Sequence, residues 1–460
     1  MRKIWKGIIT LLCVATIAGG FAACNDAESA YDIAVKNGFV GTEEEWLTSL
    51  HGANGKDAES LDAHDLYETA KENGFVGTYL EFCSQIGIQA LPANDTQQIA
   101  KNIMSVVEVN CGFSLTTSGG FGRPSQIEYS QSMGSGVIID LNKEAGSALI
   151  VTNYHVLYNE NSDVKGISDN IYVYLYGALN RFSPQTGDVN GNGMRATYVG
   201  GAMDYDIALL RVDGNEYLKR SAATEVTMGN SEALVEGEEV FAIGNPEGAG
   251  ISVTNGILSV KSEYISISAL DGRDEDGDGY VDEVSYRVMR TEAAINSGNS
   301  GGALFNMKGE LIGITNAKSI GEETDNMGYA LPITQVNYLC DNILDNDGVV
   351  KCATLGVMVG ITDSVAVLKD GALEIIEEIT VAGAAESNKA SSYKLLREGD
   401  VFKWAQLNGV KTELTRRYYL NDLLLTVRKG DTLVLGVMRD GTETTVTIQF
   451  TEDSHFTQYK

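Results

Sequence analysis

Short runs of β-branched and apolar residues dominate the chain from about residue 100 onward. Turns rich in Gly, Asn and Asp separate them, and helical periods are few after an opening segment at residues 97–104. Many short strands at regular spacing are typical of β-barrels or β-sandwiches. The clearest runs are residues 105–109, 136–139, 148–152, 171–175 and 207–212. The pattern therefore predicts a mostly β fold for this part of the chain.

The N-terminus has the pattern of an export signal. Basic residues precede an apolar run at residues 8–21, and small residues then lead to Cys24. The run is shorter than the roughly 20 residues that a spanning helix needs, which favours a signal peptide. The Cys at its exit resembles the lipobox of bacterial lipoproteins, so lipid on Cys24 would anchor the mature protein to a bacterial membrane. The alternative is an ordinary cleaved signal with an incidental Cys.

Residues 31–50 and 67–86 repeat one pattern at a constant offset of 36 residues. In each copy a Gly ends a first segment of helical period, and a Thr-x-x-Glu capping box opens a second. We therefore expect tandem helical hairpins. Their role would be that of a spacer between the membrane and the next domain.

Composition limits the partners that the protein can have. The chain holds 34 Lys and Arg against 63 Asp and Glu, a net charge of −29. Nucleic-acid phosphates are bound by basic patches, so we expect no nucleic-acid partner.

Six Cys in 460 residues are too sparse for a disulfide scaffold. Beyond the signal, pairing in an oxidising compartment and buried thiols are both open for Cys83, Cys111, Cys340 and Cys352.

Three segments carry the residue types of nucleophilic catalysis. His155 follows an apolar strand-like run, Asp206 heads another, and Ser300 stands in a Gly-rich loop. A Ser hydroxyl is a weak nucleophile that needs an adjacent base, and the base needs a buried acid to fix its tautomer. The glycines let the backbone turn tightly, so the Gly298 and Ser300 amides can point at one spot. That spot would be an oxyanion hole.

Five motifs make residues 100–340 resemble the bacterial HtrA/DegP group of trypsin-like serine proteases. In family order they are Thr-Asn-Tyr-His-Val at 152–156, Asp-Ile-Ala-Leu-Leu at 206–210, Ala-Ile-Gly-Asn-Pro at 242–246, Gly-Asn-Ser-Gly-Gly at 298–302 and Gly-Tyr-Ala-Leu-Pro at 328–332. The resemblance implies a double β-barrel in which His155 is the general base, Asp206 the orienting acid and Ser300 the nucleophile. Asp204 competes for the acid, but Asp206 directly precedes the apolar strand as in the family. No cofactor is implied for catalysis.

The residues before Ser300 bear on specificity. In the trypsin fold the sixth residue before the nucleophile lies at the base of the primary pocket, and here it is Ala294, beside Ile295. No acid stands there, so we expect cleavage after small or medium aliphatic residues rather than after Lys or Arg. The substrate would lie as an added strand near residues 315–318.

An acidic loop precedes the nucleophile and fits an EF-hand-like calcium pattern, except that its twelfth position lacks the usual Glu. A structural Ca²⁺ is one hypothesis and a solvated hairpin tip is the other. The candidate ligands are Asp274, Asp276, Asp278, Tyr280 and Asp282, the Tyr through its carbonyl.

After residue 346 the strand pattern starts again and resembles the PDZ domain that follows the protease in HtrA-like proteins. Such a domain binds a peptide C-terminus by strand addition, with backbone amides holding the carboxylate. The expected loop is Leu355, Gly356 and Val357. The alternative is a small β-domain with a filled groove.

The sequence thus predicts a signal peptide at 1–24, a helical repeat spacer at 25–95, a trypsin-like protease at 96–346 and a PDZ domain at 350–460. The expected protein is an extracytoplasmic, lipid-anchored serine endopeptidase that cleaves unfolded or misfolded proteins and binds peptide C-termini. The resemblance also implies a homotrimer. The alternative function is a non-catalytic or latent PDZ adaptor or chaperone on the cell surface.

Overall fold

The computed structural model describes residue 42 and residues 95–118, 124–275, 277–316, 327–369, 372–384 and 395–459. The chain divides into two compact units, Met1–Leu91 and Pro92–Lys460, and every element below belongs to the second. The predicted signal with Cys24 lies outside the described residues, as do both repeats apart from Thr42. In the part of the chain that is described, no helix is both long and apolar enough to cross a membrane.

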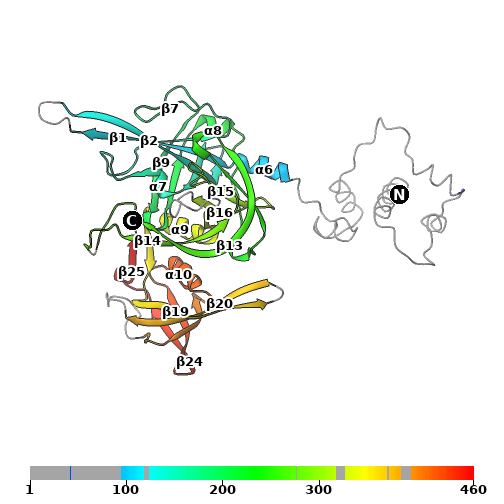
Figure 1. Cartoon of the computed structure of the whole chain (residues 1–460), viewed down its shortest axis with the longest axis vertical. Helices are drawn as coiled ribbons and strands as arrows, with labels where there is room; N and C mark the ends of the chain where they lie inside the picture. The colour runs from blue at the N-terminus through cyan, green and yellow to red at the C-terminus, as the bar shows by residue number, and fades with distance from the viewer. Residues whose placement is uncertain are drawn as a thin grey trace. The chain divides into compact units, whose positions relative to one another are not determined.

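Helix α6 (Asp95–Ile103) opens the described chain, and six antiparallel strands after it close a first barrel (Figure 1). Alternate residues of its first strand, Val107, Val109 and Cys111, pack in the cluster that fills the barrel, as the two-residue period of a strand requires. In the order of pairing the strands are β1 (Val106–Thr117), β2 (Gln126–Asn142), β3 (Ser147–Thr152), β10 (Ile207–Val212), β9 (Met194–Ala202) and β6 (Asn170–Leu175).

A second sheet holds seven strands. Pairing between β16 and β17 closes six of them into a ring, and β11 lies at the edge, parallel to β16. In order they are β11 (Thr227–Met228), β16 (Glu310–Asn316), β15 (Ala303–Asn306), β12 (Glu239–Gly244), β13 (Ser252–Ser268), β14 (Glu283–Thr291) and β17 (Gly328–Pro332). The predicted mostly β, trypsin-like double-barrel fold is therefore confirmed.

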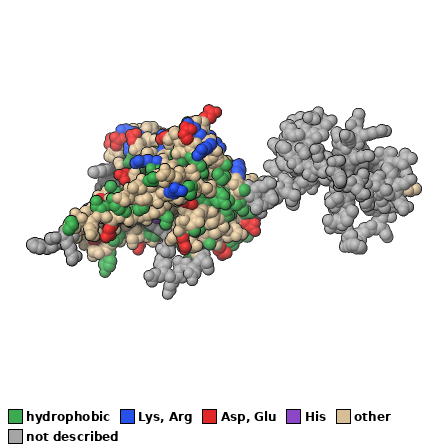
Figure 2. Space-filling model, turned by 90° about the horizontal axis from the view of Figure 1, so that it is seen from above, with side chains coloured by type: hydrophobic (Ala, Val, Ile, Leu, Met, Phe, Trp, Pro, Cys, Tyr) green, Lys and Arg blue, Asp and Glu red, His purple; other side chains and the backbone are tan. Residues whose placement is uncertain are grey.

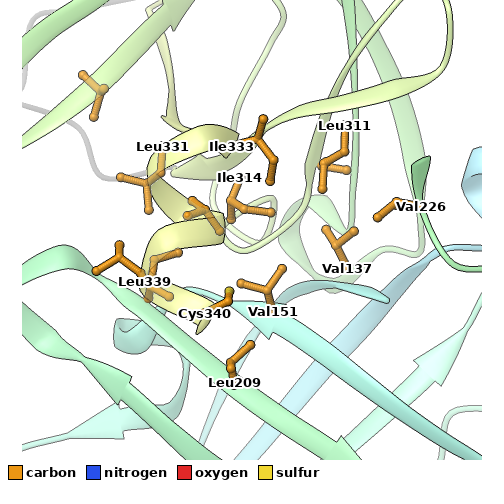
Figure 3. Packing of buried hydrophobic residues seen from close by; sticks show 14 of the residues in the cluster. Val137, Val151, Leu209, Val226, Leu311, Ile314, Leu331, Ile333, Leu339 and Cys340 are labelled. Atoms are coloured by element: carbon orange, nitrogen blue, oxygen red, sulfur yellow. The ribbon is translucent and has the colours of Figure 1, made fainter. Parts of the chain in front are cut away.

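One hydrophobic cluster joins the two barrels and helix α9 (Ile333–Asp345). Figure 3 shows Val137, Val151 and Leu209 of the first barrel facing residues of the second barrel and of α9. The buried residues of α9 recur at helical spacing, which gives the helix one apolar face. The two barrels thus pack against each other through one shared core.

The last part of the chain has its own hydrophobic cluster. Strands β18 (Val350–Ala353) and β25 (Phe456–Tyr459) pair with each other. The larger sheet of this part follows the order β19 (Val357–Lys369), β20 (Ala372–Ala384), β21 (Val401–Leu407), β23 (Thr432–Arg439) and β24 (Thr442–Gln449), with β22 (Val410–Glu413) paired to β21. Helix α10 (Arg417–Thr426) packs beside this sheet, and its Leu425 reaches the cluster of the barrels.

Short elements complete the described chain. They are helices α7 (Tyr154–Leu157) and α8 (Glu216–Arg220), strand pairs β4 (Tyr158–Asn159) with β5 (Gly166–Ile167) and β7 (Phe182–Ser183) with β8 (Gly187–Asp188), and the 3-10 turns η1 (Met203–Tyr205), η2 (Ser231–Ala233), η3 (Pro246–Gly248) and η4 (Asp453–His455). On the face shown in Figure 2, Lys and Arg side chains lie interspersed with Asp and Glu side chains. Cys111, Cys340 and Cys352 carry free thiols, whereas Cys83 lies outside the described residues.

Candidate active site

His155 and Asp206 form a two-point contact at the ends of neighbouring strands. Strand β3 ends at Thr152, and His155 lies on α7 rather than on the strand itself. Its backbone N–H donates to Asp206 Oδ1 at 2.9 Å, and its Nδ1 lies 2.7 Å from Asp206 Oδ2. A nitrogen facing a carboxylate carries the proton, so Nε2 is left as the acceptor. The imidazole therefore has the tautomer that a general base needs.

Asp206 is buried and held by several donors. It caps η1 in the left-handed region, at φ 52°, a conformation that costs energy in a non-Gly residue and recurs at functional sites. The side chain is 1% exposed, and Asn316 Nδ2 donates to its Oδ2 at 3.0 Å. Asn153 Nδ2 donates to its backbone carbonyl at 2.9 Å. A buried carboxylate is tolerable only with such partners.

Asp204, the competing acid, is engaged elsewhere. Its Oδ1 lies 2.6 Å from Arg273 Nη2, in an ion pair with the acidic loop. The acid beside His155 is Asp206.

Ser300 lies in the loop that leads into β15, and packing brings this loop next to α7. Gly301 has φ 83°, and a Cβ there would overlap Ser135 O and stand 3.0 Å from Asn153 N. A Cβ on Gly134 would lie 3.0 Å from Ser300 O and 2.7 Å from Val156 Cγ1. Gly301 thus lies close to Asn153, and Ser300 O lies close to the strand segment that Val156 contacts. The structure brings His155, Asp206 and the Ser300 loop into one place.

Ser135, in the middle of β2, holds this loop and was missed by sequence reasoning. Its N–H donates to Ser300 O at 2.8 Å and its Oγ donates to Gly298 O at 2.7 Å. The same Oγ accepts from Asn245 N at 2.8 Å, while its carbonyl accepts from Thr152 Oγ1. The only sequence signal is its position between two glycines. One buried serine therefore ties the nucleophile loop to both barrels.

The proposed oxyanion donor Gly298 has φ 91°, and a Cβ there would overlap Asn245 O. Ser297 O accepts from Glu247 N at 2.7 Å. Because a trans peptide is planar, the Gly298 N–H points away from Glu247. Within the described residues this N–H donates to no hydrogen-bond acceptor. It is therefore available to a ligand.

Two further predictions concern the primary pocket at Ala294 and Ile295 and the substrate edge near residues 315–318. Ala294 is exposed and Ile295 is partly buried, and a Cβ on Gly328 would lie 2.5 Å from Ile295 Cγ1. Thr315 cannot receive an added strand, because its N–H donates to Gly302 O, its carbonyl accepts from Gly301 N, and its other side faces β17. That part of the predicted substrate edge is wrong. Residues 317–318 lie outside the described residues.

The acidic loop satisfies its own carboxylates with backbone donors. Gly277, Asp278 and Gly279 all donate N–H bonds to Asp274, and Glu275 N donates to Asp282 Oδ2. Tyr280 N donates to Asp278 Oδ1, and the Tyr280 side chain is exposed. Asp276 lies outside the described residues. Among the residues that are described, no cluster of His, Cys, Asp or Glu could hold a metal ion, so the calcium hypothesis stays a prediction.

A cavity of about 590 Å³ lies beside the loop at Leu355, Gly356 and Val357. Leu355 is buried and Gly356 has φ 66°. Strand β19 is an edge strand, paired only with β20 among the described strands. The lining includes Val357 and Val359 of β19, Leu420 and Leu424 of α10, and Tyr264 and Arg287 of the second barrel.

A fully buried arginine joins α10 to the barrels, and sequence reasoning missed it as well. Arg287 of β14 is 1% exposed, with Nη2 2.9 Å from Glu232 Oε1 and Nη1 3.2 Å from Asp422 Oδ2. Its guanidinium carbon lies 4.1 Å from the centre of the Tyr418 ring. Burial raises the pKa of Asp422 to about 6, despite Arg287. The preceding residue, Tyr286, contacts Asn316 and so reaches the environment of Asp206.

Comparisons with known proteins agree with this geometry. Residues 134–314 match the family model of the trypsin-like peptidase domain. The chain is 27% identical over 375 residues to the Serine protease Do-like HtrA of Lactococcus lactis subsp. cremoris (strain MG1363), which covers 78% of this chain and 82% of that protein. It is 31% identical over 338 residues to the Periplasmic serine endoprotease DegP of Escherichia coli (strain K12), covering 73% of this chain and 60% of that one. A protease is therefore favoured over an adaptor.

Among solved structures, the HtrA-type protease AlgW with decapeptide covers 78% of this chain and 98% of its own. Its TM-score is 0.47 at 25% sequence identity.

Proposed function

We propose that the protein acts as a serine endopeptidase of the HtrA/DegP group of trypsin-like proteases, and that His155, Asp206 and Ser300 carry out its reaction. The observation that carries this assignment is the 2.7 Å contact between His155 Nδ1 and the buried Asp206 carboxylate. A paired imidazole of this tautomer supplies the base that a serine hydroxyl needs.

The proposed reaction has two halves. Ser300 Oγ attacks the peptide carbonyl carbon while His155 Nε2 takes its proton, and the Gly298 and Ser300 amides stabilise the oxyanion. The C–N bond then breaks as His155 gives that proton to the leaving amine, which leaves an ester on Ser300. Water attacks the ester with His155 again as base, releases the carboxylic acid and restores the hydroxyl. No step needs a cofactor.

Labelling by a fluorophosphonate tests the nucleophile. The wild-type protein should become labelled and digest casein, and Ser300→Ala should do neither. Ser297→Ala is the matched control, because this exposed serine lies in the same loop three residues earlier. Equal labelling of wild type and Ser300→Ala would refute the assignment.

For the substrate, we propose cleavage after small or medium aliphatic residues of unfolded or misfolded proteins. The support is the absence of an acidic side chain at Ala294 and Ile295, so that nothing there complements Lys or Arg. A peptide library digested by the wild-type protein measures this preference. Cleavage mainly after Arg would contradict it.

We propose that residues 350–460 form a PDZ domain that binds peptide C-termini. Its support is the open edge of β19 beside α10, with the Gly356 loop at one end of the cavity. A peptide would add to β19 as a strand, with its carboxylate at the loop. Amidation of the peptide's C-terminus should then abolish binding, and unchanged binding would refute the proposal.

We also propose an extracytoplasmic location with a lipid on Cys24, supported by the signal-like residues 1–24. Detergent phase separation of the expressed protein tests the anchor. The wild type should enter the detergent phase and Cys24→Ser should stay in the aqueous phase, because only a lipidated protein enters the detergent. The trimer that the resemblance implies is tested by the mass of the soluble mature protein. Structural Ca²⁺ in the acidic loop is tested by calorimetry, where no heat on adding calcium would remove the idea.

A further inference from the structure

The cavity beside β19 has an apolar end and a charged end. Asn342 Nδ2 donates both to Leu425 O and to Lys351 O, so the C-terminal end of α10 lies beside β18, the strand that leads into the Gly356 loop. Arg417 begins α10, seven residues before Leu424, which is about 10 Å along a helix at 1.5 Å per residue. Arg417 therefore stands at the end of the cavity away from the loop.

Three arginines line this cavity: Arg273, Arg287 and Arg417. Arg273 lies 2.6 Å from a carboxylate oxygen of Asp204, and Arg287 lies 2.9 Å from one of Glu232. In the described part of the chain, no carboxylate forms an ion pair with the Arg417 side chain. Arg417 is thus the cavity's cation without a counterion among the described residues.

The surroundings of Arg417 position its side chain but give its guanidinium neither a carboxylate partner nor a hydrogen-bond acceptor for Nε. Its backbone N–H donates to Glu377 Oε2, while the other oxygen of that carboxylate pairs with Arg416. Its guanidinium carbon lies 4.9 Å from the centre of the Tyr264 ring. Its Nε is buried with no hydrogen-bond partner. A buried donor without a partner is unfavourable, and the guanidinium also has no carboxylate to balance its charge, which the carboxylate of a ligand would supply.

We propose that the cavity selects polypeptide C-termini with an apolar last residue and an Asp or Glu two positions earlier, whose carboxylate pairs with Arg417. The inference rests on the proposed binding of peptide C-termini to β19. Side chains two apart face the same way on a strand and stand about 7 Å apart. A last residue between Val357 and Leu424 therefore sends the earlier side chain toward the start of α10, within reach of the long Arg417 side chain.

Peptide binding to the full-length mature Ser300→Ala protein, measured by fluorescence anisotropy, tests the proposal without cleavage. Three labelled peptides end in Val and differ only in carrying Glu, Gln or Lys two positions before it. The Glu peptide should bind at least tenfold tighter than the Gln peptide, as a charge-assisted pair implies, and the Lys peptide weakest. Equal affinities for Glu and Gln would overturn the proposal.

Variants then assign the preference to one residue. Arg417→Gln should remove the difference between the Glu and Gln peptides, and Arg417→Glu should make Lys the preferred residue. Lys411→Gln is the control for net charge, because Lys411 pairs with Glu413 and is not part of the cavity lining. A preference for Glu that survives in Arg417→Gln, or that Lys411→Gln removes equally, would overturn the assignment.

A fourth peptide distinguishes a failure of the Arg417 preference from a failure of the proposed binding of peptide C-termini. The Glu peptide with an amidated C-terminus should not bind. If it binds as well as the free acid, the proposed C-terminal recognition fails, and the inference falls with it. If only free C-termini bind but with no preference for Glu, the recognition stands and the role of Arg417 is refuted.

Discussion

Replacing Ser135 by Ala should impair catalysis without touching a reacting residue. The side chain is fully buried, and its Oγ joins Gly298 O of the nucleophile loop to Asn245 N of the segment beside it. Ala removes both hydrogen bonds and leaves the partly buried Gly298 carbonyl and the buried Asn245 N–H without this partner. Each such group costs about 1–3 kcal/mol when buried, so the present loop conformation loses roughly 2–6 kcal/mol unless the loop moves.

Movement of the loop would displace Gly298 from the reacting carbonyl. Loss of one oxyanion donor costs about 10²–10³ in kcat. We therefore expect Ser135→Ala to lower kcat by roughly 10- to 1000-fold, with KM little changed, because the lost interaction acts on the transition state. The thermal midpoint should also fall by several degrees, because relaxation of the loop restores part of the lost hydrogen bonding and leaves a net loss of about 1–3 kcal/mol.

Steady-state hydrolysis of a chromogenic peptide and the rate of fluorophosphonate labelling measure the effect. Ser130→Ala is the matched control, because Ser130 lies on the same strand and its Oγ has no hydrogen-bond partner. Ser130→Ala should keep wild-type kcat. A Ser135→Ala protein with kcat within twofold of wild type would show that other contacts hold the loop, and the proposed role of Ser135 would be wrong.

Three further results are expected. Gly301→Ala should destabilise the protein by at least about 3 kcal/mol in urea unfolding, because Gly301 has φ 83° and its Cβ would overlap Ser135 O. Asp206→Asn should lower kcat by roughly 10³–10⁴ in peptide hydrolysis, because the amide does not hold the imidazole in the required tautomer. Burial raises the pKa of Asp422 from 3.8 to about 6, so the folded state binds this proton more tightly and stability falls as pH rises between those values, by up to about 3 kcal/mol. Asp422→Asn should remove that pH dependence in unfolding measured at both ends of the window, with Arg287 left in place.

Local patterns in the sequence were enough to predict several of the strands and to single out the candidate reactive residues. The run at 207–212 became β10 with the bounds expected, and the helical segment at 97–104 became α6, one or two residues away. His155 and Asp206 were found by residue type and motif. Their contact follows from the pairing of Ala208 with Thr152, which places the ends of β3 and β10 side by side.

Contacts between distant segments could not be predicted in this way. Nothing in the residue type of Ser135 indicates its role. Its hydrogen bonds to Gly298 and Asn245 join segments more than 100 residues apart, so they exist only in the folded chain. Arg287 is misleading by type, because arginines are almost never fully buried unless paired. Its partners Glu232 and Asp422 stand far away in sequence, so only the fold reveals why this charge can be buried.

The site of covalent labelling identifies the nucleophile itself. The wild-type protein is reacted with a fluorophosphonate and digested, and the modified residue is identified by mass spectrometry. We expect a single adduct on Ser300 that nearly disappears in Asp206→Asn. An adduct on another serine, or casein digestion by wild type with no adduct on Ser300, would contradict the role of Ser300 as nucleophile.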